Sequence, residues 1–185
     1  MSKVSEAQEI LRSLGLPARQ QNERSALTLL ALANVRPKGL WKRATQPMLR
    51  IWDIMAFMRE AYGKNYAANS RETIRRQTIH QFEQARIVDR NPDDPNRPTN
   101  SGKNCYALTS DVVSVLKSYG TSSFDEEVAR FIRRFGTLQA AYSRQRKSRQ
   151  IPLKLPDGAT VYLSPGKHNE LQVAVIRQFG PRFAP

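Results

Sequence analysis

The stretch Asn69–Val88, NSRETIRRQTIHQFEQARIV, constrains the fold of this chain more than any other segment. On a helical wheel, one side of this stretch collects Ile74, Thr78, Phe82 and Ala85. Asn69, followed three residues later by Glu72, matches a capping box, which predicts a sharp start for a helix over about 70–86. The chain must bury one side of this helix and leave a basic side to solvent or to a partner.

The arginines at the start of this predicted helix favour binding to an external anion. A helix N-terminus carries unpaired N–H groups and about half a positive charge, so cations are disfavoured there. Glu72 offsets only part of the charge of Arg71, Arg75 and Arg76, and phosphate is the anion that such a site takes most readily. The whole chain has 30 Lys and Arg against 16 Asp and Glu, a formal net charge of +14, and therefore attracts polyanions at long range.

Several other classes of protein are disfavoured by the composition. No apolar run reaches the roughly 20 residues of a membrane span, and the N-terminus carries acids without a long apolar segment, so we expect no membrane partner and no signal peptide. Cys105 is the single cysteine, which excludes an internal disulfide and fits a reducing cytoplasm. One cysteine with His80 and His168 cannot close a zinc site without several carboxylates, so we expect no structural metal.

The rest of the chain predicts a mainly α fold. Helical spacing predicts further helices over about 4–14, 23–34, 51–62, 109–119, from Ser123 past Tyr142, and 167–179. Ser123 and Glu126 match a second capping box. CYAL (105–108) suits a short strand, and IPLKL-PDG-ATVYL predicts a β-hairpin that turns at Asp157-Gly158. We expect Trp41 and Trp52 to anchor the core. We thus expect a helical domain over 1–150 and a β-hairpin with a helix over 151–185.

The order of elements in the middle of the chain matches a helix-turn-helix with a wing. The helix over 51–62 is followed by the connection GKNYAANS, by the basic helix, by a polar loop DRNPDDPNRPTNSGK without regular structure, and by the short strand. This connection is longer than the usual three or four residues. In such motifs the second helix lies in the major groove of DNA and the wing contacts the backbone. We therefore expect the multi-helix domain to have a helix-turn-helix or winged-helix-like core.

Two groups of residues are candidates for DNA contacts. Arginine can fork onto guanine O6 and N7, and glutamine onto adenine N6 and N7, each contributing about 1–3 kcal/mol of discrimination. On the helix the candidates are Arg71, Thr73, Arg75, Arg76, Gln77 and His80. In the predicted wing, Arg97 and Lys103 would contact phosphates. A solvated basic face is the alternative interpretation of the helix, and a surface histidine that of His80. The cluster RQRKSR (144–149) fits cations at a helix C-terminus.

Four blocks of the sequence together resemble the BsuBI/PstI-type restriction endonucleases: NERSALTLLALANVRP, YGKNYAANSRETIRRQTIHQFEQARIV, NPDDPNRPTNSGKNCYAL and LSPGKHNELQVAVIRQFGPRFAP. The similarity spans nearly all of the chain. It implies a bacterial, cytoplasmic type II restriction enzyme that needs Mg²⁺ and works as a homodimer on a palindromic site in double-stranded DNA. It also implies a helix-turn-helix-like N-terminal region before a nuclease domain of the PD-(D/E)xK class. The arginine-rich block of the family corresponds to Arg71, Arg75 and Arg76, which the resemblance implies are DNA contacts.

The resemblance also implies that the catalytic centre is missing from this chain. The metal-binding acids and the lysine of the family lie beyond Pro185, so we expect 151–185 to be the start of a truncated catalytic domain, without catalytic or metal-binding residues, without bound Mg²⁺ and inactive alone. Asp157 with Glu170 imitates the family's acidic motif, but a turn alone explains Asp157-Gly158. Two alternatives stay open: a free-standing winged-helix regulator that cuts nothing, and a complete small nuclease that uses Asp157 and Glu170.

Overall fold

The computed structural model describes residues 2–148, 150–155, 158–164 and 166–178, which form two compact units. The first unit covers residues 1–139 and the second covers 140–185. The secondary structure is mainly helical, as the sequence predicts, with two small antiparallel sheets. The predicted division after residue 150 falls later than the boundary between the two units, and a functional division into domains there stays a prediction.

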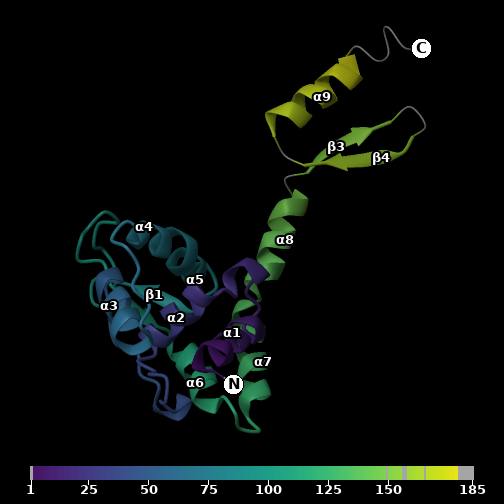
Figure 1. Ribbon diagram of the computed structural model, residues 1–185. Helices are drawn as coiled ribbons and strands as arrows, with labels where there is room; N and C mark the ends of the chain where they lie inside the picture. Colours follow the sequence, from purple (N-terminus) through teal and green to yellow (C-terminus); the bar gives the residue numbers. More distant parts are fainter. Residues whose placement is uncertain (1, 149, 156–157, 165, 179–185) are drawn as a thin grey trace. The chain divides into compact units, whose positions relative to one another are not determined.

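The first unit is built from helices around a central helix, α2. Its α-helices are α1 (Lys3–Ser13), α2 (Glu23–Leu32), α3 (Ile51–Tyr62), α4 (Ser70–Ile74), α5 (His80–Gln84), α6 (Ser110–Ser118) and α7 (Phe124–Phe135), and α8 (Leu138–Ser148) begins at its end. Two short 3-10 helices, η1 (Ala18–Gln20) and η2 (Trp41–Arg43), lie in the connections. Figure 1 shows α2 between α1 and α3, and α2 packs against both. Because it has neighbours on several sides, its leucines are buried all round.

The basic helix is one continuous helical segment with a wider turn in its middle. Between α4 and α5 the chain makes a π-helical turn, η3 (Arg75–Ile79), and we call the whole segment, residues 70–84, the basic helix. The apolar side predicted for it is confirmed as buried: Ile74, Thr78, Phe82 and Ala85. Ile79 is buried as well, so two consecutive side chains face the core, which the extra residue of a π-turn accommodates.

Both predicted capping boxes are wrong, although the helix starts they marked are close to those observed. A capping side chain needs an extended backbone at the cap residue. Asn69 instead has φ −67° and ψ −18°, and its side chain makes no capping bond. Ser123 has φ −87° and ψ −3°, also without a capping bond. The acidic residues of the two patterns, Glu72 and Glu126, instead pair with arginines on their own helices.

The long helix predicted from Ser123 past Tyr142 is also wrong, because the chain breaks after Phe135. Gly136 has φ 72°, a left-handed conformation that glycine adopts readily. The following turn packs against the N-terminal region, where the Gln139 N–H donates to the Gly15 carbonyl at 3.2 Å. Gly15 also has a positive φ, and a Cβ there would overlap the side chain of Thr137. Glycine at these two positions lets the chain end α7 and begin a separate α8.

A small sheet packs beside the basic helix in the first unit, with β1 in contact with α5. Strand β1 (Val88–Arg90) pairs antiparallel with β2 (Tyr106–Leu108), with Arg90 opposite Tyr106 and Val88 opposite Leu108. Leu49 forms an isolated antiparallel bridge to Tyr106 from the other side. The strand predicted at 105–108 is therefore confirmed over 106–108. The polar loop between the strands contains no helix or strand, as predicted.

The second unit contains the predicted hairpin and helix. Strands β3 (Ile151–Lys154) and β4 (Thr160–Leu163) pair antiparallel, and α9 (Lys167–Gln178) packs against β3. Leu153 and Val173 are buried in this small unit, while Leu171, Val175 and Ile176 are exposed along α9. Three residues of earlier predictions lie outside the described residues: Asp157 of the predicted turn, Arg149 of the cluster 144–149, and Phe179 at the end of the helix predicted over 167–179.

Candidate nucleic-acid interface

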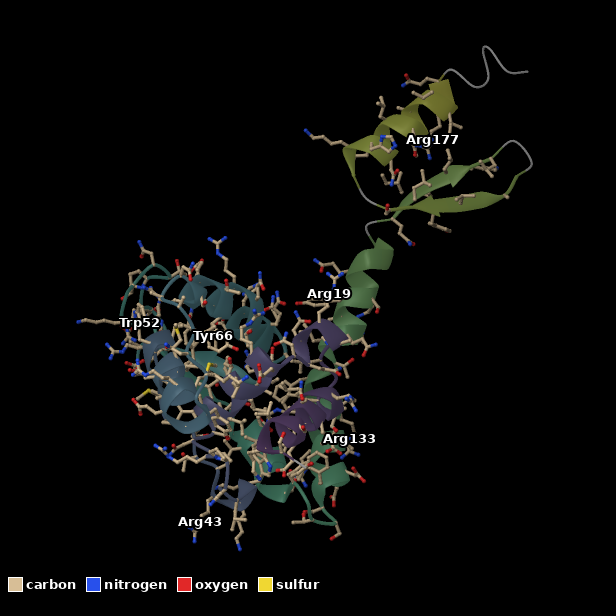
Figure 2. All side chains as sticks on the ribbon, viewed as in Figure 1. Arg19, Arg43, Trp52, Tyr66, Arg133 and Arg177 are labelled. Atoms are coloured by element: carbon tan, nitrogen blue, oxygen red, sulfur yellow. The ribbon has the colours of Figure 1, made fainter. Side chains whose placement is uncertain are left out.

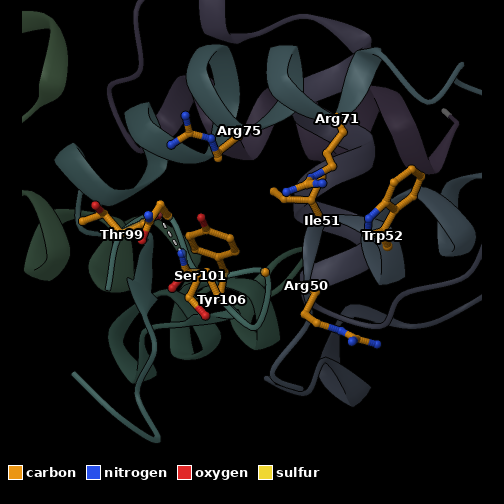
Figure 3. A pocket seen from close by; sticks show the side chains of 11 residues that line it. Arg50, Ile51, Trp52, Arg71, Arg75, Thr99, Ser101 and Tyr106 are labelled. Atoms are coloured by element: carbon orange, nitrogen blue, oxygen red, sulfur yellow. Dashed lines mark hydrogen bonds between the residues drawn. The ribbon is translucent and has the colours of Figure 1, made fainter. Parts of the chain in front are cut away.

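Side chains of the basic helix border a hollow on the surface of the first unit. The N-terminus of α3 contributes Arg50, Ile51 and Trp52, the basic helix contributes Arg71 and Arg75, and the sheet and its loop contribute Tyr106, Asn104 and residues 99–102. Figure 3 shows Arg71 and Arg75 on one side of the hollow and Ser101 with Tyr106 on the other. Three segments that are distant in sequence therefore meet around one basic depression.

A second hollow adjoins the first along the same helix. It is lined by Arg75, Arg76, His80, Glu83, Arg90, Thr99 and Tyr106. Arg75, Thr99 and Tyr106 line both hollows, so the two are continuous on the surface. We call the residues that line either hollow the basic face. Among the residues that the structure describes, this face carries five arginines and one carboxylate, Glu83; the arginines are Arg50, Arg71, Arg75, Arg76 and Arg90.

Trp52 lies on this face and not in the core, which corrects one prediction. Its side chain is 49% exposed, whereas Trp41 is 4% exposed and is the core anchor that the sequence predicts. The guanidinium carbon of Arg71 lies 5.8 Å from the centroid of a Trp52 ring, within the range of a cation–π contact. Figures 2 and 3 show Trp52 at the surface of α3 and its ring beside Arg71. The contact positions the first arginine of the basic helix over an aromatic surface.

Arg75 and Arg76 are both bound by Glu72. Arg75 donates from Nε to Glu72 Oε2 at 2.9 Å and from Nη2 to Oε1 at 2.6 Å, and Arg76 donates from Nε to the same Oε1. The hydrogen bond from Arg75, with a second from Arg76, lowers the pKa of Glu72 to about 2. The expectation that these arginines await an outside anion is therefore corrected: in the free protein a local carboxylate holds both. The Arg76 side chain is nevertheless 72% exposed.

Two more arginines of the basic face have carboxylate partners. Arg50 Nε donates to Asp53 Oδ2 at 3.1 Å, and this hydrogen bond lowers the pKa of Asp53. Arg90 Nε lies 3.8 Å from Glu83 Oε1. Burial nevertheless raises the pKa of Glu83, although Arg90, His80 and Arg75 act in the opposite direction. The positive charge of this face is thus partly balanced in the free protein.

The loop between β1 and β2 is ordered by its own polar side chains. Buried Asn91, at φ 47°, accepts from the Cys105 N–H at 2.9 Å and donates from Nδ2 to Asn104 Oδ1 at 2.8 Å. The Arg97 side chain is only 16% exposed and donates to Asp93 Oδ2 at 2.6 Å and to the Lys103 carbonyl at 2.9 Å. Arg97 therefore holds the loop together, which differs from the phosphate contact expected for it. The loop presents residues 99–102 to the first hollow.

Comparisons with known proteins identify the family. The family model of the "BsuBI/PstI restriction endonuclease HTH domain" matches residues 1–140, one residue more than the first unit. The chain belongs to the BsuBI/PstI restriction endonuclease family. It is 45% identical over 184 residues to the type II restriction enzyme BsuBI of Bacillus subtilis, covering 100% of this chain and 58% of that protein. It is 30% identical over 178 residues to the type II restriction enzyme AplI of Arthrospira platensis, covering 96% of this chain and 55% of that one.

A solved structure agrees with this membership of the BsuBI/PstI family. The structure of SdaI restriction endonuclease superposes with a TM-score of 0.71 at 35% identity, covering 98% of this chain and 57% of that chain. The chain thus spans less than three fifths of the length of each of these relatives. The match extends through both units, so the likeness in fold is not restricted to the helix-turn-helix domain.

Within this member of the family, the predicted DNA-contact residues fall into two groups. One group lines the basic face, as expected for side chains that the sequence places on one helix: Arg71, Arg75, Arg76 and His80. In residues 2–139, all of which the structure describes, Thr73, Gln77, Arg97 and Lys103 line neither hollow. Gln77 accepts from Arg24 Nη2 of α2 at 3.2 Å, and Arg24 Nε also donates to buried Thr78, so Gln77 lies toward α2. Lys103 is exposed at the loop.

Sequence reasoning missed several residues of the basic face in this family member. Arg50, Trp52 and Arg90 come from elements other than the basic helix, as do loop residues 99–102. For Trp52 a signal was available, because it lies off the stripe of Ile51, Ile54, Met55 and Met58 that α3 buries. For Arg50 and Arg90 the local sequence carries no such signal, since only the fold brings them beside Arg71 and Arg76.

The described residues also bear on metals and membranes. Among them, no group of three or more His, Cys, Asp or Glu side chains could hold a metal ion. Glu170 of the alternative nuclease pattern is exposed on α9, and its proposed partner Asp157 lies outside the described residues. No helix in the described part of the chain is long and apolar enough to cross a membrane.

Proposed function

We propose that the first unit binds double-stranded DNA through the basic face. The observation that carries this proposal is the convergence of Arg50, Arg71, Arg75, Arg76 and Arg90, from three separate segments, around two continuous hollows. Arginine is the side chain best suited to fork onto phosphates and guanine edges. The exposed Trp52 beside Arg71 extends this face with an aromatic surface. Membership of a family whose matched domain is named as a helix-turn-helix domain supports the same conclusion.

We further propose that the unit reads DNA as a winged helix. In this proposal α3 and the basic helix form the helix-turn-helix, and residues 70–76 enter the major groove. Strands β1 and β2, with the loop 91–105 between them, form the wing. The bridge from Leu49 to Tyr106 extends this small sheet on the other side of β2. The loop, ordered by Asn91 and Arg97, contacts the backbone next to the groove through residues 99–102.

The activity of a longer protein containing this sequence is a separate part of the proposal. The relatives are named as type II restriction enzymes, and each is longer than this chain. We propose that a longer protein containing this sequence cleaves DNA with Mg²⁺, as a homodimer on a palindromic site. The described residues do not fit a metal site, and we assign no cleavage step to them. In this proposal the second unit begins the nuclease domain, and the first unit supplies recognition.

The experiment that tests DNA binding is a salt titration of affinity for a random-sequence duplex. If the basic face makes about six to ten phosphate contacts, counterion release lowers affinity by roughly 10³–10⁵ between 50 and 200 mM salt. Fluorescence anisotropy of a labelled duplex measures this directly. An affinity that changes little over this range, or no binding at low salt, contradicts the proposal.

A further inference from the structure

Glu72 accepts hydrogen bonds from the guanidinium groups of two arginines on the basic face, Arg75 and Arg76. The fork formed by Arg75 Nε and Nη2 holds both carboxylate oxygens, at 2.9 and 2.6 Å, and Arg76 Nε donates to one of them as well. A guanidinium fork binds a phosphate, or the O6 and N7 edge of guanine, with the same pair of N–H groups. Glu72 therefore stands where DNA would bind, and the two cannot occupy the fork of Arg75 together.

The arrangement follows from local spacing on the basic helix. Residues 72, 75 and 76 are related by i, i+3 and i+4, which places their side chains next to each other on a helix. The alternative role of Glu72, a capping box with Asn69, is not used, because Asn69 makes no side-chain capping bond. All three side chains are substantially exposed, so the pairing is not buried in the core and can exchange with solvent anions.

We propose that Glu72 is a specificity-determining residue that competes with DNA phosphates for Arg75 and Arg76. This inference rests on the proposed DNA binding, and it explains how Glu72 would limit binding to non-specific DNA. On a random duplex, phosphates must displace the carboxylate, which then remains close to the negative backbone without a partner. In the major groove, a correctly placed base offers its amino group, cytosine N4 or adenine N6, to the released carboxylate. The exchange is therefore favourable only where such a base faces residue 72.

The experiment compares Glu72→Gln with the unchanged chain on a random-sequence duplex. Removing the competing charge frees the arginines for one more phosphate, so the plot of log affinity against log salt becomes steeper by about 0.9. If the two affinities converge near 1 M salt, this slope change corresponds to roughly eightfold tighter binding at 0.1 M. Glutamine keeps the length of the side chain, and circular dichroism checks that the basic helix is retained.

A matched control is available on α7. Glu127 accepts from Arg130 Nη1 at 3.0 Å, also at i, i+3, and neither residue lines the basic face within residues 2–139, which the structure describes throughout. Glu127→Gln makes the same change in net charge, and we expect its slope and affinity to match those of the unchanged chain. Random-duplex affinity that rises equally in both variants, or in neither, overturns the inference while DNA binding itself stands. Absence of salt-dependent binding by the unchanged chain overturns the proposed function as well.

Discussion

Replacing both Arg75 and Arg76 with alanine is expected to weaken duplex binding strongly while leaving the fold intact. Arg75 lines both hollows and Arg76 lines the second, so the double variant removes the centre of the basic face. On a duplex that carries the recognition sequence, each arginine that contacts a base edge contributes about 1–3 kcal/mol, which is roughly 5- to 150-fold in affinity for each side chain. Anisotropy titrations with a duplex at fixed low salt measure the loss.

The melting temperature of the same double variant should stay close to that of the unchanged chain. Both side chains are exposed, and their ion pairs with Glu72 are surface pairs, which contribute about 0–1 kcal/mol to stability. The control is Arg130→Ala with Arg133→Ala, which removes the same charge from α7 and should weaken binding much less. Figure 2 shows Arg133 and Trp52 on opposite sides of the first unit. Equal loss in both double variants would mean that net charge, and not the basic face, drives binding.

Phe82→Ala is expected to have the opposite profile, with a large loss of stability. The Phe82 side chain is 0% exposed and belongs to the buried side of the basic helix. Truncating a buried phenylalanine costs about 3–5 kcal/mol, because apolar contacts are lost and a cavity remains. Chemical denaturation followed by circular dichroism measures this free energy of unfolding.

The Phe82 prediction has its own control and its own contradicting result. Phe82→Leu keeps much of the side-chain volume and should cost clearly less than the alanine variant. Below its melting temperature the alanine variant should still bind the duplex, since within residues 2–139, which the structure describes, Phe82 lines neither hollow. A cost below 1 kcal/mol for Phe82→Ala would show that the helix does not depend on this contact for its docking.

The buried side of the basic helix could be predicted because it depends on periodicity. Ile74, Thr78, Phe82 and Ala85 repeat at helical spacing, and packing of one helix face follows from that repeat. The partners of Asn69 and Glu72 could not be predicted in the same way. A capping box requires an extended backbone at residue 69, and the chain there is helical, so the carboxylate binds the arginines one turn later.

The candidate site could be predicted only for the residues that one helix brings together. Arg71, Arg75, Arg76 and His80 share the basic face because they share that helix. Arg50 and Arg90 lie 19 or more residues away from Arg71 along the chain, and long-range contacts place them there. Arg97 was expected at a phosphate because of its charge, whereas in the free protein its donors bind Asp93 and the Lys103 carbonyl, partners that the sequence does not reveal.

The comparisons bear on the alternative of a free-standing winged-helix regulator. Family membership and relatives named as type II restriction enzymes favour a recognition unit of such an enzyme over a free-standing regulator, although both would bind DNA. A complete small nuclease would need Asp157 and Glu170 to converge on one cation. Asp157 lies outside the described residues, so this alternative stays a prediction.

Protection of individual arginines by a bound duplex tests the central claim most directly. Phenylglyoxal modifies exposed guanidinium groups, and peptide mass spectrometry reports the extent at each arginine with and without DNA at low salt. We predict that DNA protects Arg71, Arg75 and Arg76 on the basic helix and leaves Arg130 and Arg133 on α7 as reactive as before. Unchanged reactivity at the three helix arginines in a saturated complex, or stronger protection on α7, would contradict the claim that this helix faces the DNA.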